Sequence, residues 1–386
     1  IVVFKDNAAD SEAAADNIVN KHNLGHLHTY SHALKGFSAV IPKAKLKAIK
    51  DDPRVDFISE DRIVTIFDKP EMLAKPYPVV SAQQTPTGIS RINAVNKTNT
   101  GAGINVAVLD TGIALDHPDL KANIAGGKNC STGRSYDDGN GHGTHVAGTI
   151  AALNNTIGVV GVAPGAKLWA VRVLNNSGSG TWSSVICGID FVTSKAPQKG
   201  GPITVANMSL GGQGTSDNNC GNTNNDALHK AICRSRDAGV VYVVAAGNDA
   251  ANAKNFVPAA YDDAVITVSA LADSDGQPNG LYRATPYGPD DTFATFSNYG
   301  TSTVDLGAPG VNIYSTWKGG GYKTISGTSM ASPHVAGSVA LYLKTNPNST
   351  WTQVRDGLKA AGEALGFGHT DPSELHPEPV VQVGSF

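Results

Sequence analysis

Two patterns of apolar residues divide the chain. Before residue 68, short apolar stretches alternate with runs of helix-forming residues. The expected elements, in order, are a strand at IVVF, an Ala-rich helix from Ser11 to Asn23, strands near Leu27 to Tyr30 and Gly36 to Ile41, a Lys-rich helix from Lys43 to Lys50, and a last strand ending in IVTIF. Ser11 is the expected helix cap. The order βαββαβ predicts a small ferredoxin-like α+β sheet with two helices on one face.

From about Ala82 onward, longer apolar runs alternate with helical stretches and glycine-rich turns. These runs are INVAVLD, KLWAVRVL, ITVANMSL, VVYVVAAGN and AVITVSA. Strands that are apolar almost throughout are buried on both faces, so this part predicts an α/β domain with helices covering both faces of a mostly parallel sheet. The final twenty residues are rich in Pro and polar residues, and we expect them to wrap the surface or add an edge strand.

The stretch DKPEMLAKPYP between the two patterns contains three prolines, which predicts an exposed linker. We therefore expect a small domain at 1–67, a linker at 68–81 and a large domain at 82–386.

Charge and hydropathy exclude two classes of partner. The 30 Lys and Arg residues against 33 Asp and Glu leave no basic surplus for phosphates, so we expect no nucleic acid partner. No stretch approaches the ~18 apolar residues that a membrane span needs, and we expect a soluble monomer. The chain opens at Ile1 without Met or an apolar leader, so we expect that a segment was removed upstream.

The four cysteines fit neither a C-x-x-C pair nor zinc-like spacing. Disulfides, and hence an extracellular location, are the favoured interpretation. Cys220 and Cys233 bracket a polar, Asn-rich stretch that would gain from closure, which leaves Cys130 with Cys187 among the three possible pairings. Buried free thiols in a cytosolic protein are the alternative.

Three short patterns contain the residue types of nucleophilic catalysis. Asp110 ends the strand INVAVLD, at the sheet edge where parallel sheets build their sites, although a cap or turn residue would look the same. His142 in GNGHGTHVAGTI lies in a loop before a helix of small residues, where an imidazole can carry a proton. His145, three positions later, could suggest a metal-binding pair, but the sequence shows no H-E-x-x-H pattern and no third ligand. Ser329 in GTSMASPHVAG begins a helix whose N-terminus favours an oxyanion, with a plain helix cap as the alternative.

Taken in the order Asp, His, Ser, these blocks resemble those of the subtilases, close to the subtilisin and proteinase K groups, from about Ala82 to Leu365. The resemblance implies a serine endopeptidase in which Ser329 attacks the scissile carbonyl, His142 takes its proton and Asp110 holds the imidazole in its productive tautomer. It also implies that Asn248 in VVAAGND helps the N–H of Ser329 to hold the oxyanion, where a turn Asn is the alternative.

The same resemblance implies two strands that grip an extended substrate by its main chain. The residues concerned are Ser209, Leu210, Gly211 and Gly212 on one side and Gly178, Gly180 and Trp182 on the other. Trp182, Val185 and Leu210 would wall an apolar pocket for the side chain four residues before the cut, unless they are ordinary core. No Asp or Glu can be placed at the base of the primary pocket, which Phe256 would narrow, so we expect a broad, apolar-leaning specificity.

A calcium site is also implied, because AALNNTIGVVGVAP resembles the high-affinity calcium loop of the family. Its oxygen ligands for Ca²⁺ would come from Gln83, Asp119, Leu153, Asn155, Ile157 and Val159.

The N-terminal domain resembles the family's propeptide, which assists folding and then inhibits. Its apolar tail, Val64, Thr65, Ile66 and Phe67, would lie in the groove like the acyl half of a cleaved substrate, with first processing after Phe67. The resemblance thus implies a secreted, self-processing zymogen. An esterase or acyl transferase with the same triad, and a catalytically silent binding protein on the fold, are the alternatives.

Overall fold

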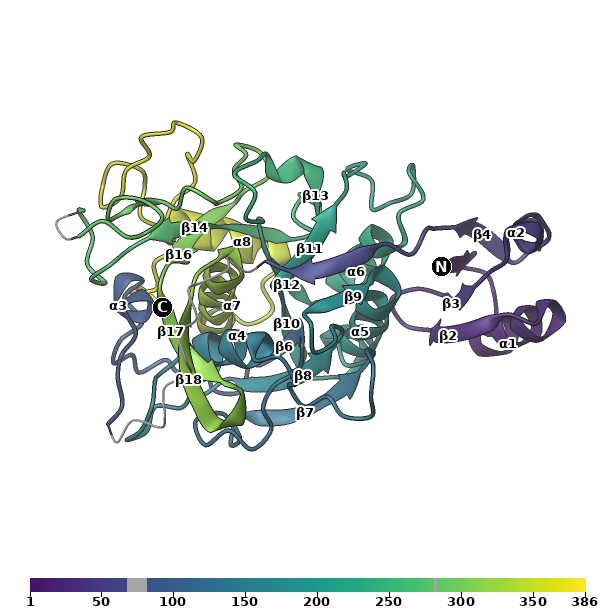
Figure 1. Ribbon diagram of the computed structural model, residues 1–386, viewed down its shortest axis with the longest axis horizontal. Coiled ribbons are helices and arrows are strands. Elements are labelled where there is room, and N and C mark those ends of the chain that lie inside the picture. Colours follow the sequence, from purple (N-terminus) through teal and green to yellow (C-terminus); the bar gives the residue numbers. More distant parts are fainter. Residues whose placement is uncertain (68–81, 281–282) are drawn as a thin grey trace.

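The structure, a computed structural model, describes residues 1–67, 82–280 and 283–386 (Figure 1). The linker expected at 68–81 lies outside the described residues. The N-terminal part forms a small lobe, which lies beside helices α5 (Trp182–Ser194) and α6 (Ala227–Asp237) of a much larger lobe (Figure 1).

The small lobe is the expected split sheet with two helices. Its elements are β1 (Val2–Phe4), α1 (Ser11–His22), β2 (Gly25–Tyr30), β3 (Gly36–Val40), α2 (Lys43–Lys50) and β4 (Val55–Ile58), and the strands lie in the order β2-β3-β1-β4. One detail of the prediction is wrong, because Asp10 and not Ser11 caps α1. The Asp10 carboxylate accepts the N–H of Ala13 at 3.0 Å, while Ser11 is already helical and buried.

A second detail is also wrong, since IVTIF is not the last strand of this sheet. β4 completes the sheet, and β5 (Ile63–Ile66) pairs instead with two strands of the large lobe. The alternating pattern of IVTI identifies a strand but does not say which sheet it joins.

Alternate residues of β1 face two different layers. Val2 and Phe4 pack with Ile18 of α1 and Ile49 of α2, so both helices cover the same face of the sheet. Val3 points the other way and packs in one cluster with apolar residues of α5 and α6. The small sheet is therefore buried on both faces only while it lies against the large lobe.

The large lobe contains the expected mostly parallel sheet. Its strands are β6 (Asn105–Asp110), β7 (Ile124–Asn129), β8 (Lys167–Arg172), β10 (Ile203–Met208), β12 (Val241–Ala245), β14 (Ile266–Ala272), β15 (Thr292–Phe293) and β16 (Leu306–Pro309). They lie in the order β15-β14-β12-β10-β6-β8-β7, with β16 beside β14, and these pairs are parallel except for β14 with β15.

Helices cover both faces of this sheet. Val106 and Val108 of β6 pack in one cluster with α4 (His142–Ala151) and α7 (Thr328–Thr345). Ala107 and Leu109, which point to the opposite face, pack in another cluster with α5 and α6. The near-continuous apolar character of the strand follows from this double burial.

The remaining elements lie around the sheet. They are α3 (Thr87–Arg91), α8 (Trp351–Ala361), the 3-10 turns η1 (Pro197–Lys199), η2 (Ala253–Asn255) and η3 (Lys318–Gly320), and the strands β9 (Ser179–Thr181), β11 (Leu210–Gln213), β13 (Phe256–Val257), β17 (Ile313–Trp317) and β18 (Gly321–Ile325). The last twenty residues hold no strand of their own; Val380 forms isolated bridges with Gly307 and Glu363. This segment wraps the large lobe, which was one of the two expected alternatives.

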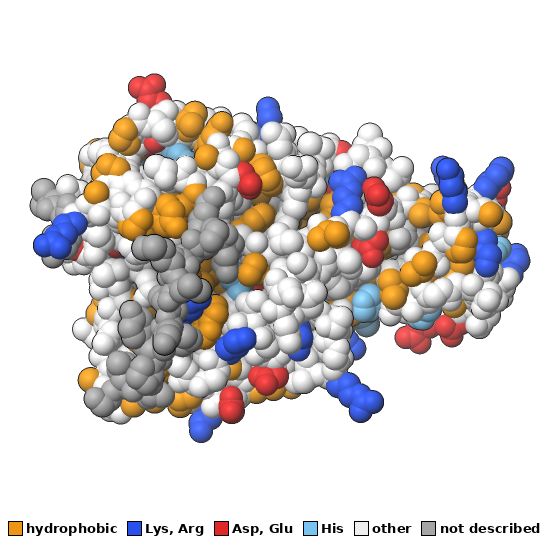
Figure 2. Space-filling model, in the orientation of Figure 1, with side chains coloured by type: hydrophobic (Ala, Val, Ile, Leu, Met, Phe, Trp, Pro, Cys, Tyr) orange, Lys and Arg blue, Asp and Glu red, His pale blue; other side chains and the backbone are white. Residues whose placement is uncertain are grey.

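Positive and negative side chains are interspersed on the face of the large lobe that Figure 2 shows. Within the described residues, no helix has the length and apolar character needed to cross a membrane.

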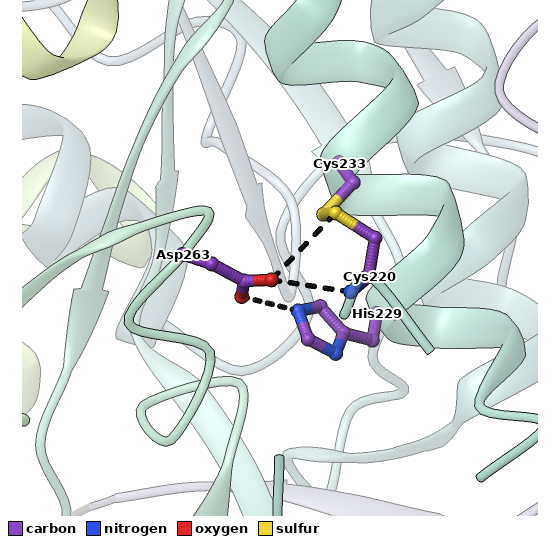
Figure 3. Close-up of side chains that lie close together, drawn as sticks. All are labelled: Cys220, His229, Cys233 and Asp263. Atoms are coloured by element: carbon purple, nitrogen blue, oxygen red, sulfur yellow. Dashed lines mark hydrogen bonds and ion pairs between the residues drawn. A yellow bond between two sulfur atoms is a disulfide. The ribbon is translucent and has the colours of Figure 1, made fainter. Parts of the chain in front are cut away.

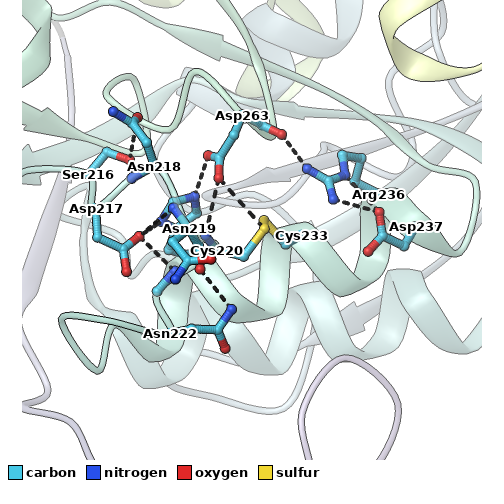
Figure 4. Close-up of a disulfide and its surroundings, with 12 residues drawn as sticks. Ser216, Asp217, Asn218, Asn219, Cys220, Asn222, Cys233, Arg236, Asp237 and Asp263 are labelled. Carbon is cyan, nitrogen blue, oxygen red and sulfur yellow. Dashed lines mark hydrogen bonds and ion pairs between the residues drawn. A yellow bond between two sulfur atoms is a disulfide. The ribbon is translucent and has the colours of Figure 1, made fainter.

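Both expected disulfides are present. Cys130 bonds to Cys187 and Cys220 to Cys233, and no cysteine is free. The second bond closes the Asn-rich loop onto α6, where Asp217 also accepts backbone N–H groups of the loop (Figure 4). The free-thiol alternative is therefore wrong.

Replacing one cysteine pair by Ala is expected to lower the free energy of unfolding by roughly 2–5 kcal/mol. The sequence separations are 57 for Cys130–Cys187 and 13 for Cys220–Cys233. Loop entropy makes the loss larger for the first pair by about 1.3 kcal/mol. Urea unfolding followed by circular dichroism measures both variants. A larger loss from the second pair would contradict this order.

Candidate active site

The carboxyl edge of the parallel sheet brings the first two predicted residues together. Asp110 is the last residue of β6 and His142 is the first of α4. Their side chains are fully buried, with 2.7 Å between Asp110 Oδ1 and His142 Nδ1. Burial raises the pKa of Asp110, against the opposing effects of the His142 imidazole and the N–H of Thr111. The hydrogen bond fixes the orientation of the imidazole ring.

The loop before His142 is held by a residue that the sequence analysis missed. Asp138 Oδ1 accepts the N–H of Gly141 at 2.9 Å, and Asp138 Oδ2 accepts the N–H and hydroxyl of Thr144 at 3.0 and 2.6 Å. Asp138 Oδ1 also accepts the hydroxyl of Thr111 at 2.9 Å. An Asp shortly before a Gly-Asn-Gly run is a signal for this kind of local cap.

The other two predicted residues also meet at one point. Ser329 lies in the first turn of α7, and Asn248 follows β12 in the next loop. The carbonyl oxygen of Phe67 lies 3.0 Å from Ser329 Oγ and 2.5 Å from Asn248 Nδ2. Asn248 Oδ1 accepts the N–H and hydroxyl of Thr328 at 2.9 and 2.8 Å, so its amide is oriented with Nδ2 toward Phe67. Thr328 is a second residue that the sequence analysis did not single out.

Ser209 lies beside the same group. Its carbonyl oxygen is 3.3 Å from Ser329 Oγ, and its hydroxyl donates to the carbonyl of Ser329 at 2.9 Å. β10 ends at Met208 and runs parallel to β6 and β12. Asp110, Ser209 and Asn248 therefore lie at the same edge of the sheet.

The tail of the small lobe lies between the two segments that were expected to bind substrate. β5 pairs antiparallel with β11, where Leu210 faces Ile66 and Gly211 faces Thr65. It also pairs antiparallel with β9, where Val64 faces Gly180. On the same side, the N–H of Ile66 donates to the carbonyl of Gly178 at 3.0 Å. This arrangement makes β5 a central strand in the order β13-β11-β5-β9.

Two side chains of the tail are directed inward. Val64 is fully buried in a cluster that includes Trp182, Val185 and Leu210. The Phe67 ring lies against Gly211, where a Cβ atom would come within 2.5 Å of Phe67 Cζ.

Two further residues border the tail. Arg62 lies over the Trp182 ring, with 4.7 Å from Cζ to the ring centroid, a contact that the sequence did not suggest. Phe256 pairs with Gln213 across β13 and β11, beside Gly212, which faces Val257.

The residues expected to bind calcium also converge. Gln83 Nε2 donates to the carbonyls of Leu153 and Val159 at 2.8 and 3.3 Å. Asn155 Nδ2 donates to Asp119 Oδ1 at 2.7 Å, and the N–H of Val159 donates to Asp119 Oδ2 at 2.8 Å. Burial raises the pKa of Asp119 despite these bonds.

This donor set fits a hard cation. Turning over the Gln83 amide would direct its oxygen toward the carbonyls of Leu153 and Val159, and these oxygens together with the Asp119 carboxylate are ligands of the kind that Ca²⁺ prefers. Ile157 joins the group through its N–H, which donates to Asn155 Oδ1 at 2.7 Å.

Comparisons with known proteins match both parts of the chain. The Subtilase family matches residues 101–373, and the Peptidase inhibitor I9 family matches residues 1–67. The thermostable alkaline protease of Halalkalibacterium halodurans is 40% identical over 359 residues, which cover 92% of this chain and 85% of that protein. Subtilisin NAT of Bacillus subtilis subsp. natto is 38% identical over 374 residues, covering 95% of this chain and 85% of that protein.

A solved structure of a cold-adapted subtilisin-like serine proteinase is also similar, with a TM-score of 0.59 and 36% identity, covering 75% of this chain and 92% of the other. Fold, site and comparisons together define a serine peptidase that carries an inhibitory N-terminal domain. The chain belongs to the subtilase family.

Val64→Asp is expected to release the tail from the groove, because it would bury a carboxylate without a partner at a cost of at least ~2 kcal/mol. Amide hydrogen exchange of β5 in a Ser329→Ala background should then be about thirtyfold faster. Thr65→Asp is the matched control, since Thr65 is the exposed neighbour on the same strand. Equal exchange rates in the two variants would contradict the burial of Val64 as the cause.

Proposed function

We propose that this chain is a secreted endopeptidase that cleaves proteins through Asp110, His142 and Ser329, with Asn248 as an oxyanion donor. The observation that carries the proposal is the position of the Phe67 carbonyl oxygen, 3.0 Å from Ser329 Oγ and 2.5 Å from Asn248 Nδ2. A peptide carbonyl is thus held between a hydroxyl nucleophile and an amide donor, as acyl transfer requires.

In this mechanism Ser329 Oγ forms a bond to the carbonyl carbon, and its proton passes to His142. The imidazole then gives that proton to the leaving amine, and water releases the acyl group in a second round. Asp110 contributes by accepting a hydrogen bond from His142 Nδ1, which directs Nε2 to the reaction. Asn248 is pre-oriented by Thr328, so stabilising the oxyanion needs no rearrangement.

A broad specificity with an apolar preference follows from how the tail is bound. Main-chain pairing with β9 and β11 makes little demand on sequence. Phe67 against Gly211 represents the residue before the cut, and Val64 in its apolar cluster represents the fourth residue before the cut.

The N-terminal part acts, in this proposal, as an inhibitor that is cut from the enzyme after Phe67, with domains at 1–67 and 82–386 and the segment 68–81 between them. Besides the tail, one carboxylate supports the contact between the lobes. Asp190 of α5 accepts the N–H groups of His32 and Ala33 at 2.7 Å each. Since Asp190 is largely buried there, these charge-assisted bonds add to the affinity.

Calcium, secretion and a monomeric state complete the proposal. The Asp119 group would hold one Ca²⁺, which has a structural role and takes no part in peptide cleavage. Two disulfides support an oxidising compartment. The near-balanced charge supports protein substrates rather than nucleic acid as partners.

Ser329→Ala is expected to abolish proteolysis and to leave the chain uncut near residue 67, because it removes the nucleophile. Casein digestion and the mass of the purified chain are the measurements. Assaying the parent protein on casein and on a simple ester, with and without a serine-directed inhibitor, tests the alternative. Ester hydrolysis without proteolysis would favour an esterase, and normal casein digestion by the variant would refute the assignment.

Asn248→Ala is expected to lower kcat by about a hundredfold to a thousandfold with little change in KM, because the lost donor acts mainly in the transition state. Asn248→Asp is the matched variant, since it keeps the oxygen that binds Thr328 and replaces only the donor. An Asp variant with near-normal kcat would show that Asn248 acts by holding Thr328.

Removing calcium with EDTA is expected to lower the melting temperature in a Ser329→Ala background. A ligand at a hundred times its Kd stabilises the folded state by about 2.7 kcal/mol. Asp119→Asn should remove most of this calcium dependence, whereas Asp116→Asn, at an exposed position in the same loop, should keep it. Equal calcium dependence in both variants would place the ion elsewhere.

A further inference from the structure

A cluster of three buried carboxylates lies at the far edge of the large sheet, where β14 and β15 form an antiparallel pair. Leu271 faces Phe293 and Ala272 faces Thr292, and the acids flank this last pair of the ladder: Asp273 follows β14, and Asp290 and Asp291 precede β15. One carboxylate oxygen from each of the three acids lies within 4.8 Å of the other two, and all three residues are at most 6% exposed.

Like charges held this close repel one another, and the repulsion is stronger in a buried site. One buried cation, Arg91 of α3, reaches part of the cluster, with 2.7 Å between its Nε and Asp291 Oδ1. The same guanidinium also forms two hydrogen bonds to Glu363, at 2.9 and 2.7 Å. The charge of Arg91 is therefore divided between Asp291 and Glu363, and it lowers the pKa of Asp273 only against the larger, raising effect of burial.

Asp273 and Asp290 also accept hydrogen bonds from the residues that follow β14. Asp273 Oδ1 accepts the N–H of Gly276 at 3.0 Å, and Asp290 Oδ1 accepts the N–H and hydroxyl of Ser274 at 2.7 and 2.9 Å. Asp273 Oδ2 is buried and has no hydrogen-bond partner within the described residues, although the side chain is only 2% exposed. Burial, together with the charges of Asp291 and Asp290, raises the pKa of Asp273 to about 7. A buried acceptor of this kind normally has a partner.

We propose that Asp273, Asp290 and Asp291 bind a hard divalent cation, Ca²⁺ in the first place, that ties the end of β14 to the residues just before β15. Three carboxylates without nitrogen or sulfur donors match the preference of Ca²⁺ for oxygen ligands. The cation would offset the mutual repulsion of the three carboxylates and would give the buried Asp273 Oδ2 a partner. The site is built from residues directly after β14 and directly before β15, and none of its ligands belongs to the Asp119 group.

A second cluster of metal-ligating residue types does not support a similar proposal. Cys220, His229, Cys233 and Asp263 lie close together (Figure 3). Cys220 and Cys233 are bonded to each other, so they offer no thiolate for a metal. Asp263 Oδ1 lies 2.6 Å from His229 Nε2, so these two groups already satisfy one another.

The test is a count of bound calcium ions. The full chain carrying Ser329→Ala is stripped with EDTA and titrated with CaCl₂, and bound ions are counted by native mass spectrometry and isothermal titration calorimetry. Asp273→Asn is expected to bind one ion fewer than the parent, or to bind it at least tenfold more weakly, because a charged ligand is lost. Asp275→Asn is the matched control: it removes one charge from the same loop, and Asp275 Oδ1 accepts only the N–H of Gln277 among the described contacts.

Thermal unfolding with and without calcium gives a second measurement. With EDTA present, Asp273→Asn is expected to be as stable as the parent or more stable, because it removes a buried charge; with calcium present it should be less stable. Asp290→Asn should behave in the same way. If both variants bind as many ions as the parent, or are more stable than the parent in both conditions, the carboxylates share a proton and bind no cation, and the proposal is overturned. Because no measurement uses peptidase activity, this outcome is independent of the proposed function.

Discussion

Strand β5 lies between β9 and β11, and the hydrogen bonds on its two edges decide where Phe67 ends. Leu210 faces Ile66 and Gly180 faces Val64. Because side chains alternate along a strand, a shift by one residue would turn Val64 to solvent and move the Phe67 carbonyl away from Ser329 and Asn248. One pairing register thus sets the burial of the tail, the contact of the two lobes and the position of a peptide carbonyl in the site.

The same pairing explains why the small lobe depends on the large one. One face of its sheet is covered by α1 and α2, and the other by α5 and α6. A domain of this size buries only about 60% of the surface of its unfolded chain by itself and is marginally stable, so the second face adds to its stability. The interface that stabilises the small lobe is therefore continuous with the contacts that hold its tail between β9 and β11.

Buried charge is a second theme of the large lobe. Asp110 and Asp138 lie in the interior at the carboxyl edge of the sheet, where hydrogen bonds from His142, Gly141 and Thr144 compensate them. Burying a carboxylate costs free energy unless its oxygens accept hydrogen bonds, and the groups that donate these bonds are then held in fixed positions. At this edge the hydrogen bonds fix the orientation of the His142 ring and of the loop that precedes it. At the opposite end, the cluster around Asp273 has the same burial with one cation shared between two acids.

Much of this protein is determined locally by its sequence. The apolar runs, the helical stretches and the motifs around positions 110, 142 and 329 specified the elements, the sheet class and the residues of the site, because strand and helix periods and motif chemistry are local properties. The sequence did not determine which sheet the stretch IVTI joins, that Asp138 and Thr328 orient the site, or that Asp273 and Asp291 lie close together in the interior. These facts depend on contacts between residues far apart in the chain, and only the tertiary structure, which brings distant backbone edges and buried charges together, decides them.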